Sequence, residues 1–448
     1  MSPRDAPPSA GAGTPGAEHS TITILEGMQL RREPPPPDRF SFDKLIETNI
    51  LFLGGIGSGK TNAMKHLVRQ FRDKNGPEDL FVFFDAKGDF LKNFYRPGDA
   101  VISSSGEAEE GGVVWNVFRD LADDPRQRAE QAFEIASTIF SDELESAAQN
   151  MFFATAARDI FAGVMELMAA GASPGASMSN EDLRTKLEGS AEELLDFLES
   201  SEAHAGTARY LDGGETQVQP ILAFLQPTLR KAFSGIFRER GGFSVRDFVR
   251  RRGGHALFIE YDISVGSSLL PVYRVLMDLA MKEALGFGRQ RLQTMEKVPD
   301  NFYFVLDEFA LLPRLSHVGD GINFGRELGL RFLVATQNVN QVFHGYPGGA
   351  GESILSGFGT VLAFRLADKI SRDLVRERYG TNRKQISTYA PIRHEGVRQK
   401  VVDGNVIEDW DMSGLVKGQC IVLVPLEPPF LLKFNKFQGR PSARLPAR

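Results

Sequence analysis

The chain has 448 residues, and its apolar and charged fractions of 42% and 25% are ordinary for a folded protein of about two or three domains. The net charge of −6 excludes a protein that coats nucleic acid with its whole surface, although a local basic lining stays compatible with it. The single cysteine, Cys420, excludes an intramolecular disulfide and fits a reducing cytosol.

The amino-acid sequence offers no candidate for a membrane-spanning helix. The nearest stretch, residues 160–172, contains Glu166 and is shorter than the roughly 18 to 20 apolar residues that a span needs. The N-terminal residues also lack the basic-then-apolar pattern of a signal peptide. We therefore expect a cytoplasmic protein that reaches a membrane only through a partner.

Residues 1–39 are predicted to form a disordered tail and linker, rich in proline and glycine. A strand is expected at residues 21–30. The four prolines at 34–37 are typical of a stiff, extended spacer, and a site for a proline-binding partner is the less favoured alternative. Residues 436–448 are expected to form a C-terminal tail.

Residues 40–124 are predicted to be the first part of a nucleotide-binding domain. Residues 54–61 fit G-x-x-x-x-G-K-[ST], and they lie between an apolar strand at 49–53 and a helix at 62–71. Glycines let backbone N–H groups turn toward a phosphate, and the helix N-terminus adds its dipole. We expect ATP to bind at Gly54, Gly55, Gly57, Ser58, Gly59, Lys60, Thr61 and Asn62.

Two side chains of this loop have expected roles of their own. Lys60 would reach the β- and γ-phosphates, and the Thr61 hydroxyl would ligate Mg²⁺. An ordinary glycine-rich turn is the alternative, but the Lys-Thr pair and both flanking elements favour the nucleotide site. A second buried strand at 80–84 and a short third one at 101–102 predict a parallel sheet.

Residues 125–240 are predicted to form an inserted all-α domain. Helical periodicity dominates at 129–140, 143–168, 180–187, 191–200 and 217–235, and a loop is expected at 171–177. The overlapping segment 230–252 combines many arginines with four phenylalanines. Such a segment can track a nucleic-acid backbone, but an amphipathic segment with phenylalanines in the core is slightly favoured.

Residues 241–435 are predicted to be the second part of the nucleotide-binding domain. Strands are expected at 255–261, 302–306, 331–335, 360–364, 420–425 and 430–434. Helices are expected at 269–286, 318–328 and 368–379, and a turn at 403–405.

Two acidic residues complete the candidate site. Asp307 and Glu308 directly follow the apolar strand at 302–306, and such a position faces the ligand crevice of an α/β sheet. We expect Asp307 to hold Mg²⁺ and Glu308 to polarise the attacking water. Gln337 closes the next strand and either senses the γ-phosphate or is a plain loop amide. Arginine-finger candidates are Arg326, Arg365, Arg372, Arg376 and Arg378.

The motifs occur in one order along the chain. After the loop come Phe83-Phe84-Asp85-Ala86-Lys87-Gly88-Asp89, Trp115-Asn116-Val117-Phe118, Val305-Leu306-Asp307-Glu308-Phe309-Ala310 and Ala335-Thr336-Gln337-Asn338. This order resembles the conjugative coupling proteins of the TraD, TraG and TrwB type, within the FtsK/HerA superfamily of DNA-pumping ATPases. Ala86 and Asp89 stand where the family usually has proline and glutamate.

The resemblance implies a RecA-like P-loop fold with a central, mostly parallel sheet plus an all-α insert. It also implies a hexameric ring around DNA, an insert that contacts the relaxase or other substrate, and an arginine finger from the neighbouring subunit. By position Arg365 looks like that finger, and Arg326 is a second candidate. Family members usually begin with transmembrane helices, where this chain has its proline-rich tail, so we expect a partner to mediate docking to a secretion channel.

The leading hypothesis is an ATP-hydrolysing DNA translocase that serves as a coupling protein for conjugative transfer or type IV secretion. One alternative is a HerA/FtsK-like translocase for DNA processing or defence. The other is a nucleotide-dependent secretion or scaffold ATPase that does not move on DNA. DNA binding that weakens steeply with salt would argue against this last alternative.

Overall fold

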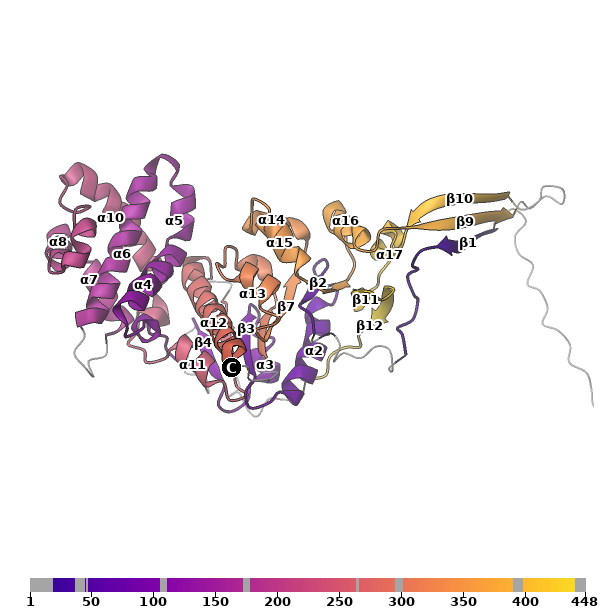
Figure 1. Ribbon diagram of the computed structural model, residues 1–448, viewed down its shortest axis with the longest axis horizontal. Coiled ribbons are helices and arrows are strands. Elements are labelled where there is room, and N and C mark those ends of the chain that lie inside the picture. Colours follow the sequence, from indigo (N-terminus) through magenta and orange to yellow (C-terminus); the bar gives the residue numbers. More distant parts are fainter. Residues whose placement is uncertain are drawn as a thin grey trace, which may run out of the picture.

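A central nine-stranded sheet organises the computed structural model, which describes residues 19–36, 45, 47–104, 111–171, 178–262, 266–294, 301–389 and 398–439. The strand order is β12-β11-β8-β2-β7-β6-β3-β5-β4 (Figure 1). From β8 to β4 all neighbours are parallel, whereas β11 pairs antiparallel with β8 and with β12. The expected α/β class with a mostly parallel sheet is confirmed.

The strands match the apolar runs of the sequence. Their bounds are β2 Ile50–Leu53, β3 Leu80–Asp85, β4 Ala100–Ser103, β5 Ala256–Glu260, β6 Phe302–Leu306, β7 Leu330–Thr336, β8 Thr360–Ala363, β11 Gln419–Leu423 and β12 Phe430–Lys433. Most are buried on both faces, as is usual for parallel strands that helices cover on both sides.

The sheet separates two hydrophobic clusters, because successive side chains of a strand point to opposite faces. One cluster joins alternate strand residues to α2 (Lys60–Lys74) and α3 (Leu91–Phe94). The other joins the remaining strand residues to α12 (Gly266–Thr294), α13 (Val318–Phe324), α14 (Val339–Gly345) and α15 (Ala350–Ser356).

The helical region lies at one end of the molecule (Figure 1). Its helices are α4 Pro125–Ile139, α5 Ser141–Ser146, α6 Met151–Gly171, α7 Asn180–Leu187, α8 Ala191–Glu199, α9 Ala205–Ala208 and α10 Glu215–Ala232, and α11 Val245–Arg251 follows. The single helix expected at 143–168 is wrong, since Ala148 has φ 42° and separates α5 from α6. Of the expected loop at 171–177, residues 172–177 lie outside the described residues.

A buried polar cluster joins the two ends of the helical region to each other. The Trp115 indole donates to Asp120 at 2.6 Å, and Asp120 also accepts from the Ser244 hydroxyl at 2.7 Å. Asn180 donates from its amide to the carbonyls of Trp115 and Phe237 at 2.8 and 3.0 Å. These contacts bring residues before α4 against residues after α10, so the sheet is resumed next to the point where it was interrupted.

A second, three-stranded antiparallel sheet projects from the opposite end (Figure 1). It consists of β1 (His19–Glu26), β9 (Thr381–Tyr389) and β10 (Arg398–Asn405). The turn expected at 403–405 is wrong, because these residues pair with β9 from Arg383 to Thr381. Among the described residues, two further α-helices are α16 (Lys369–Glu377) and α17 (Asp409–Ser413).

Of the predicted tail and linker at 1–39, residues 1–18 and 37–39 lie outside the described part of the chain, whereas His19–Glu26 forms β1. Residues 440–448 of the expected C-terminal tail also lie outside it. Within the described ranges, no helix is both long enough and apolar enough to cross a membrane.

Ion pairs fasten the helical region to the sheet domain. His317, which precedes α13, lies 3.2 Å from the Glu134 carboxylate of α4 and 3.6 Å from the Asp278 carboxylate of α12. Burial alone would lower the pKa of His317, but the two carboxylates outweigh it and raise the pKa to about 9. Arg314 extends this contact to Asp142 of α5.

We expect His317→Gln to destabilise the protein in a pH-dependent way. The pKa of His317 is higher in the folded protein than its unfolded value of about 6.5, so the charged histidine stabilises the fold. This stabilisation is fully present below pH 6.5 and is lost as the pH rises through about 9. The variant should therefore unfold with roughly 1–3 kcal/mol less free energy at pH 6.5 and with nearly wild-type free energy at pH 9.5. Denaturant unfolding at both pH values measures this, with the exposed His344→Gln as control. An equal loss at both pH values would contradict it.

Candidate nucleotide site

The loop at residues 54–61 connects β2 to α2 and has the backbone that its glycines permit. Gly57 and Gly59 have φ 71° and 114°, in the left-handed region that disfavours a side chain. A Cβ added to Gly54 would lie 2.6 Å from the Cβ of Phe364, so the space requires glycine. The Lys60 ammonium donates to the carbonyls of Gly54 and Gly55 at 2.6 and 3.2 Å.

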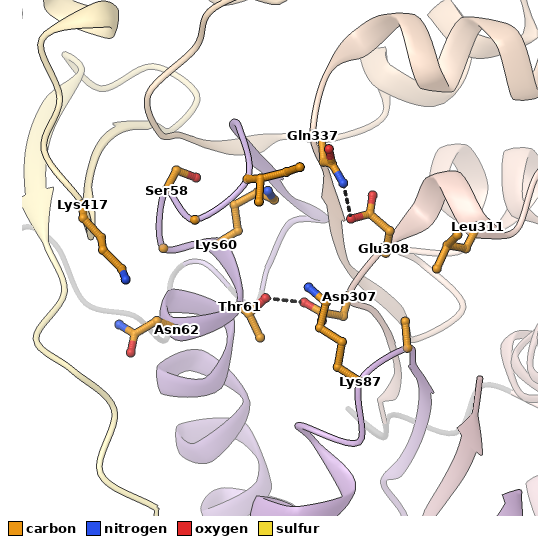
Figure 2. Close-up of a pocket in the computed structure, with 14 residues that line it drawn as sticks. Ser58, Lys60, Thr61, Asn62, Lys87, Asp307, Glu308, Leu311, Gln337 and Lys417 are labelled. Carbon is orange, nitrogen blue, oxygen red and sulfur yellow. Dashed lines mark hydrogen bonds between the residues drawn. The ribbon is translucent and has the colours of Figure 1, made fainter. Parts of the chain in front are cut away.

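Three neighbouring strands bring the predicted polar residues together, since the carboxyl ends of β2, β7 and β6 meet at one edge of the sheet. The Thr61 hydroxyl donates to Asp307 Oδ1 at 2.8 Å. The Gln337 amide donates to Glu308 Oε2 at 3.0 Å. Figure 2 shows both contacts close to Lys60.

Asp307 is buried and Glu308 is half-buried, and burial raises the pKa of both carboxylates. The contacts with Thr61 and Gln337 and the nearby Lys60 oppose this rise. Asp307 Oδ2 and Glu308 Oε1 have no hydrogen-bond partner within the described structure. Buried hydrogen-bond acceptors without a partner are typical of a ligand site. The oxygens of Thr61 and Asp307 are of the type that Mg²⁺ prefers as ligands.

These residues surround a cavity of about 490 Å³. Its lining comprises Ile56, Gly57, Ser58, Gly59, Lys60, Thr61, Asn62, Ala86, Lys87, Asp307, Glu308, Leu311, Gln337 and Lys417. Of the predicted site residues, Gly54, Gly55 and Arg365 are outside this lining. Sequence reasoning assigned no role to Ile56, Ala86, Lys87, Leu311 and Lys417.

A buried aspartate positions Lys87. Asp85 ends β3 and accepts from the backbone N–H groups of Phe90 and Leu91, both at 2.8 Å. Burial raises the pKa of Asp85 to about 6, against the effect of these hydrogen bonds. The turn that Asp85 holds carries Lys87, whose amine lies next to Asp307 in Figure 2. The motif at residues 85–89 was the signal that could have assigned Lys87 to the site.

Asn62 lines the cavity, but both ends of its amide are engaged with the C-terminal segment. Its Nδ2 donates to the Asn435 carbonyl at 2.9 Å, and its Oδ1 accepts from the Phe437 N–H at 2.8 Å. Asn62 therefore also fastens residues 435–437 to the first turn of α2.

The five arginine-finger candidates divide into two groups. Arg372 and Arg376 lie 3.7 and 3.6 Å from Asp409, and Arg378 donates to backbone carbonyls, including that of Leu355 at 3.3 Å. These three arginines are bound within their own chain. Arg326 and Arg365 are exposed, and neither side chain has a partner among the residues described.

The segment at 230–252 follows the amphipathic interpretation. Phe233, Phe237 and Phe248 are buried in the core, and Phe243 packs against Phe248. The phenylalanines therefore belong to the core, as the favoured amphipathic interpretation expected, and they are not free to stack on nucleic-acid bases.

Comparisons with known proteins agree with this geometry. Residues 41–390 match the family model of the type IV secretion-system coupling protein DNA-binding domain. The coupling protein TraD of Escherichia coli K12 is 22% identical over 406 residues, which are 88% of this chain and 53% of TraD. The chain thus spans about half the length of this relative.

Solved structures share the fold. TrwB, the plasmid coupling protein, superimposes with a TM-score of 0.73 at 17% identity in its complex with the non-hydrolysable ATP analogue ADPNP, covering 95% of this chain and 96% of TrwB. The TrwB complex with ADP and Mg²⁺ superimposes with a TM-score of 0.71 at 16% identity, covering 96% of this chain and 98% of TrwB. Because the family model spans residues 41–390, from the strand before the loop to β9, the chain belongs to the type IV secretion-system coupling proteins.

Proposed function

We propose that this protein is an ATP-hydrolysing motor that moves DNA in conjugative transfer or type IV secretion. The observation that carries the proposal is the convergence of Thr61 with Asp307 and of Glu308 with Gln337 around one glycine-rich loop. A nucleotide-binding loop alone would fit many enzymes. Hydrolysis also needs a base, and the half-buried Glu308 carboxylate beside the Gln337 amide is placed to be one.

The residues divide the chemistry between them. Lys60 and the loop N–H groups would bind the phosphates of ATP, and Thr61 and Asp307 would provide oxygen ligands for Mg²⁺. The related TrwB structures contain the ATP analogue ADPNP in one case and ADP with Mg²⁺ in another. Glu308, oriented by Gln337, accepts a proton from a water molecule. That water attacks the γ-phosphorus, the bond to the bridging oxygen breaks, and ADP and phosphate leave.

The assembly belongs to the same proposal. The family model describes a DNA-binding domain, which supports DNA as the partner. We propose a hexameric ring around DNA in the cytoplasm, with an arginine, Arg326 or Arg365, entering the site of the neighbouring subunit. A relaxase or other transfer substrate and a membrane-bound secretion partner would complete the system.

The test is the ATPase rate with and without single- and double-stranded DNA, read together with mass from light scattering. DNA should raise both the rate and the mass, and binding should weaken steeply with salt. Lys60→Ala should abolish nucleotide binding and turnover with a wild-type circular dichroism spectrum, and the exposed Lys369→Ala is the matched control.

Two results would contradict the proposal. Turnover that no form of DNA stimulates, without salt-sensitive DNA binding, would favour a secretion or scaffold ATPase. Full turnover by Lys60→Ala would remove the loop from the mechanism. A HerA/FtsK-like role in DNA processing shares the motor, and transfer of a plasmid in a mating assay separates the two biological roles.

A further inference from the structure

A turn near the C-terminus packs directly on the phosphate-binding loop. The Gly418 N–H donates to the Ser58 carbonyl at 2.8 Å, and the Gly418 carbonyl accepts from the Phe434 N–H at 2.9 Å. A Cβ added to Gly59 would lie 2.9 Å from the Gly418 Cα, so the two backbones are in close contact. Lys417 is consequently held at the rim of the nucleotide cavity by the backbone of the next residue.

The segment that follows is braced against α2. The Asn435 carbonyl accepts from Asn62 at 2.9 Å, and the Arg69 guanidinium lies 4.0 Å from the centre of the Phe437 ring. His66 packs against the same ring at 5.2 Å. These contacts fasten the segment to α2, and its Phe434 N–H bonds to Gly418, so they help to hold the turn that carries Lys417 against the loop.

Lys417 faces a different part of the cavity from the carboxylates. Figure 2 shows Glu308 and Gln337 on one side of Lys60, and Lys417 on the other side, with its amine directed toward the first turn of α2. Lys60 and Lys87 lower the pKa values of both Asp307 and Glu308. Within the described structure, the Lys417 ammonium has no carboxylate partner.

The position and chemistry of Lys417 together select its ligand. Glu308 and Gln337 mark the γ-phosphate end under the proposed function, so the opposite side receives the part of the nucleotide nearer the ribose. A lysine ammonium is a compact cation with three donors and no acceptor, which suits an anionic oxygen better than a base edge. The anionic group on that side of the loop is the α-phosphate.

We propose that Lys417 binds the α-phosphate of the nucleotide and is a binding residue of the site, an inference that rests on the proposed function. Both ATP and ADP carry this phosphate, so Lys417 strengthens the binding of both nucleotides to the same extent. An interaction with the substrate that stays the same in the transition state lowers KM and leaves kcat unchanged. Lys417 therefore holds the nucleotide through the whole cycle, including after phosphate release.

The test measures Kd for MgATP, MgADP and adenosine by calorimetry with the full chain. Lys417→Gln should lower the affinity for MgATP and for MgADP by about tenfold each and leave the affinity for adenosine unchanged. It should also raise KM for ATP with less than about a twofold change in kcat. Lys417→Arg should restore most of the affinity, because the charge is kept. Lys436→Gln, an exposed lysine of the same segment outside the cavity, is the control and should match wild type.

Each other outcome overturns the inference. Equal affinities for Lys417→Gln and Lys436→Gln would show that Lys417 makes no contact, and weaker binding of ATP alone would place it at the γ-phosphate. Weaker binding of adenosine would place it at the ribose or base. The proposed function fails separately, when wild type and Lys60→Ala bind nucleotide equally or when wild type binds none.

Discussion

Glu308→Gln should bind Mg-ATP with wild-type affinity and hydrolyse it about 10²–10⁴ times more slowly. The amide has the size of the carboxylate and keeps a partner for Gln337, which lies 3.0 Å from Glu308 in the native protein. It cannot accept the proton of the attacking water. Nucleotide titration by calorimetry measures the affinity, and steady-state ATPase assays with DNA measure the rate. The exposed Glu377→Gln serves as control.

The acid limb of the pH profile provides a second measurement. Burial raises the pKa of Glu308, and a base acts only when it is ionised. Wild-type kcat should therefore fall as pH drops through this raised pKa, and the residual activity of Glu308→Gln should lack that limb. A variant that keeps half of the wild-type rate, or the same acid limb in both proteins, would contradict the assignment of Glu308 as the base.

Local signals in the sequence were sufficient to predict the sheet and the position of Asp307, Glu308 and Gln337 beside the loop. Parallel strands covered on both sides read as short apolar runs, and Phe302–Leu306 was predicted with its observed bounds. Polar residues at the ends of such runs meet at one sheet edge whatever the intervening chain does. Asp307, Glu308 and Gln337 could therefore be placed next to the loop, although their hydrogen bonds could not.

The features that were missed depend on distant pairing. β9 and β10 are largely polar strands that are held together by antiparallel pairing with each other, so neither shows an apolar run in the sequence. Lys417 reaches the site only because Gly418 bonds to Ser58, a contact that no short-range pattern encodes. Arg365 was assigned by its order along the chain, and order does not say toward which subunit a side chain faces.

The structure separates the two remaining finger candidates by their distance from their own site. The Arg365 carbonyl accepts from the Gly55 N–H at 3.1 Å, so this residue stands beside its own loop. Arg326 precedes β7, and the seven residues of that strand place it roughly 20 Å from Gln337 at the far end. Arg326 is therefore too far from its own site to reach it, and in the proposed ring we expect it to act on the neighbouring subunit. The neighbouring Phe324 is 70% exposed, which suits a subunit contact.

Arg326→Ala should lower DNA-stimulated turnover by about 10³-fold or more without loss of nucleotide binding. Equal mixing with inactive Glu308→Gln should then restore activity, because about a quarter of the interfaces in a random ring pair an intact Glu308 with an intact Arg326. An arginine that acts within its own subunit gives no complete site in any mixture. Arg365→Ala, treated in the same way, should gain nothing from mixing. Restoration with Arg365→Ala and not with Arg326→Ala would reverse the two assignments and make Arg365 the residue that crosses the interface.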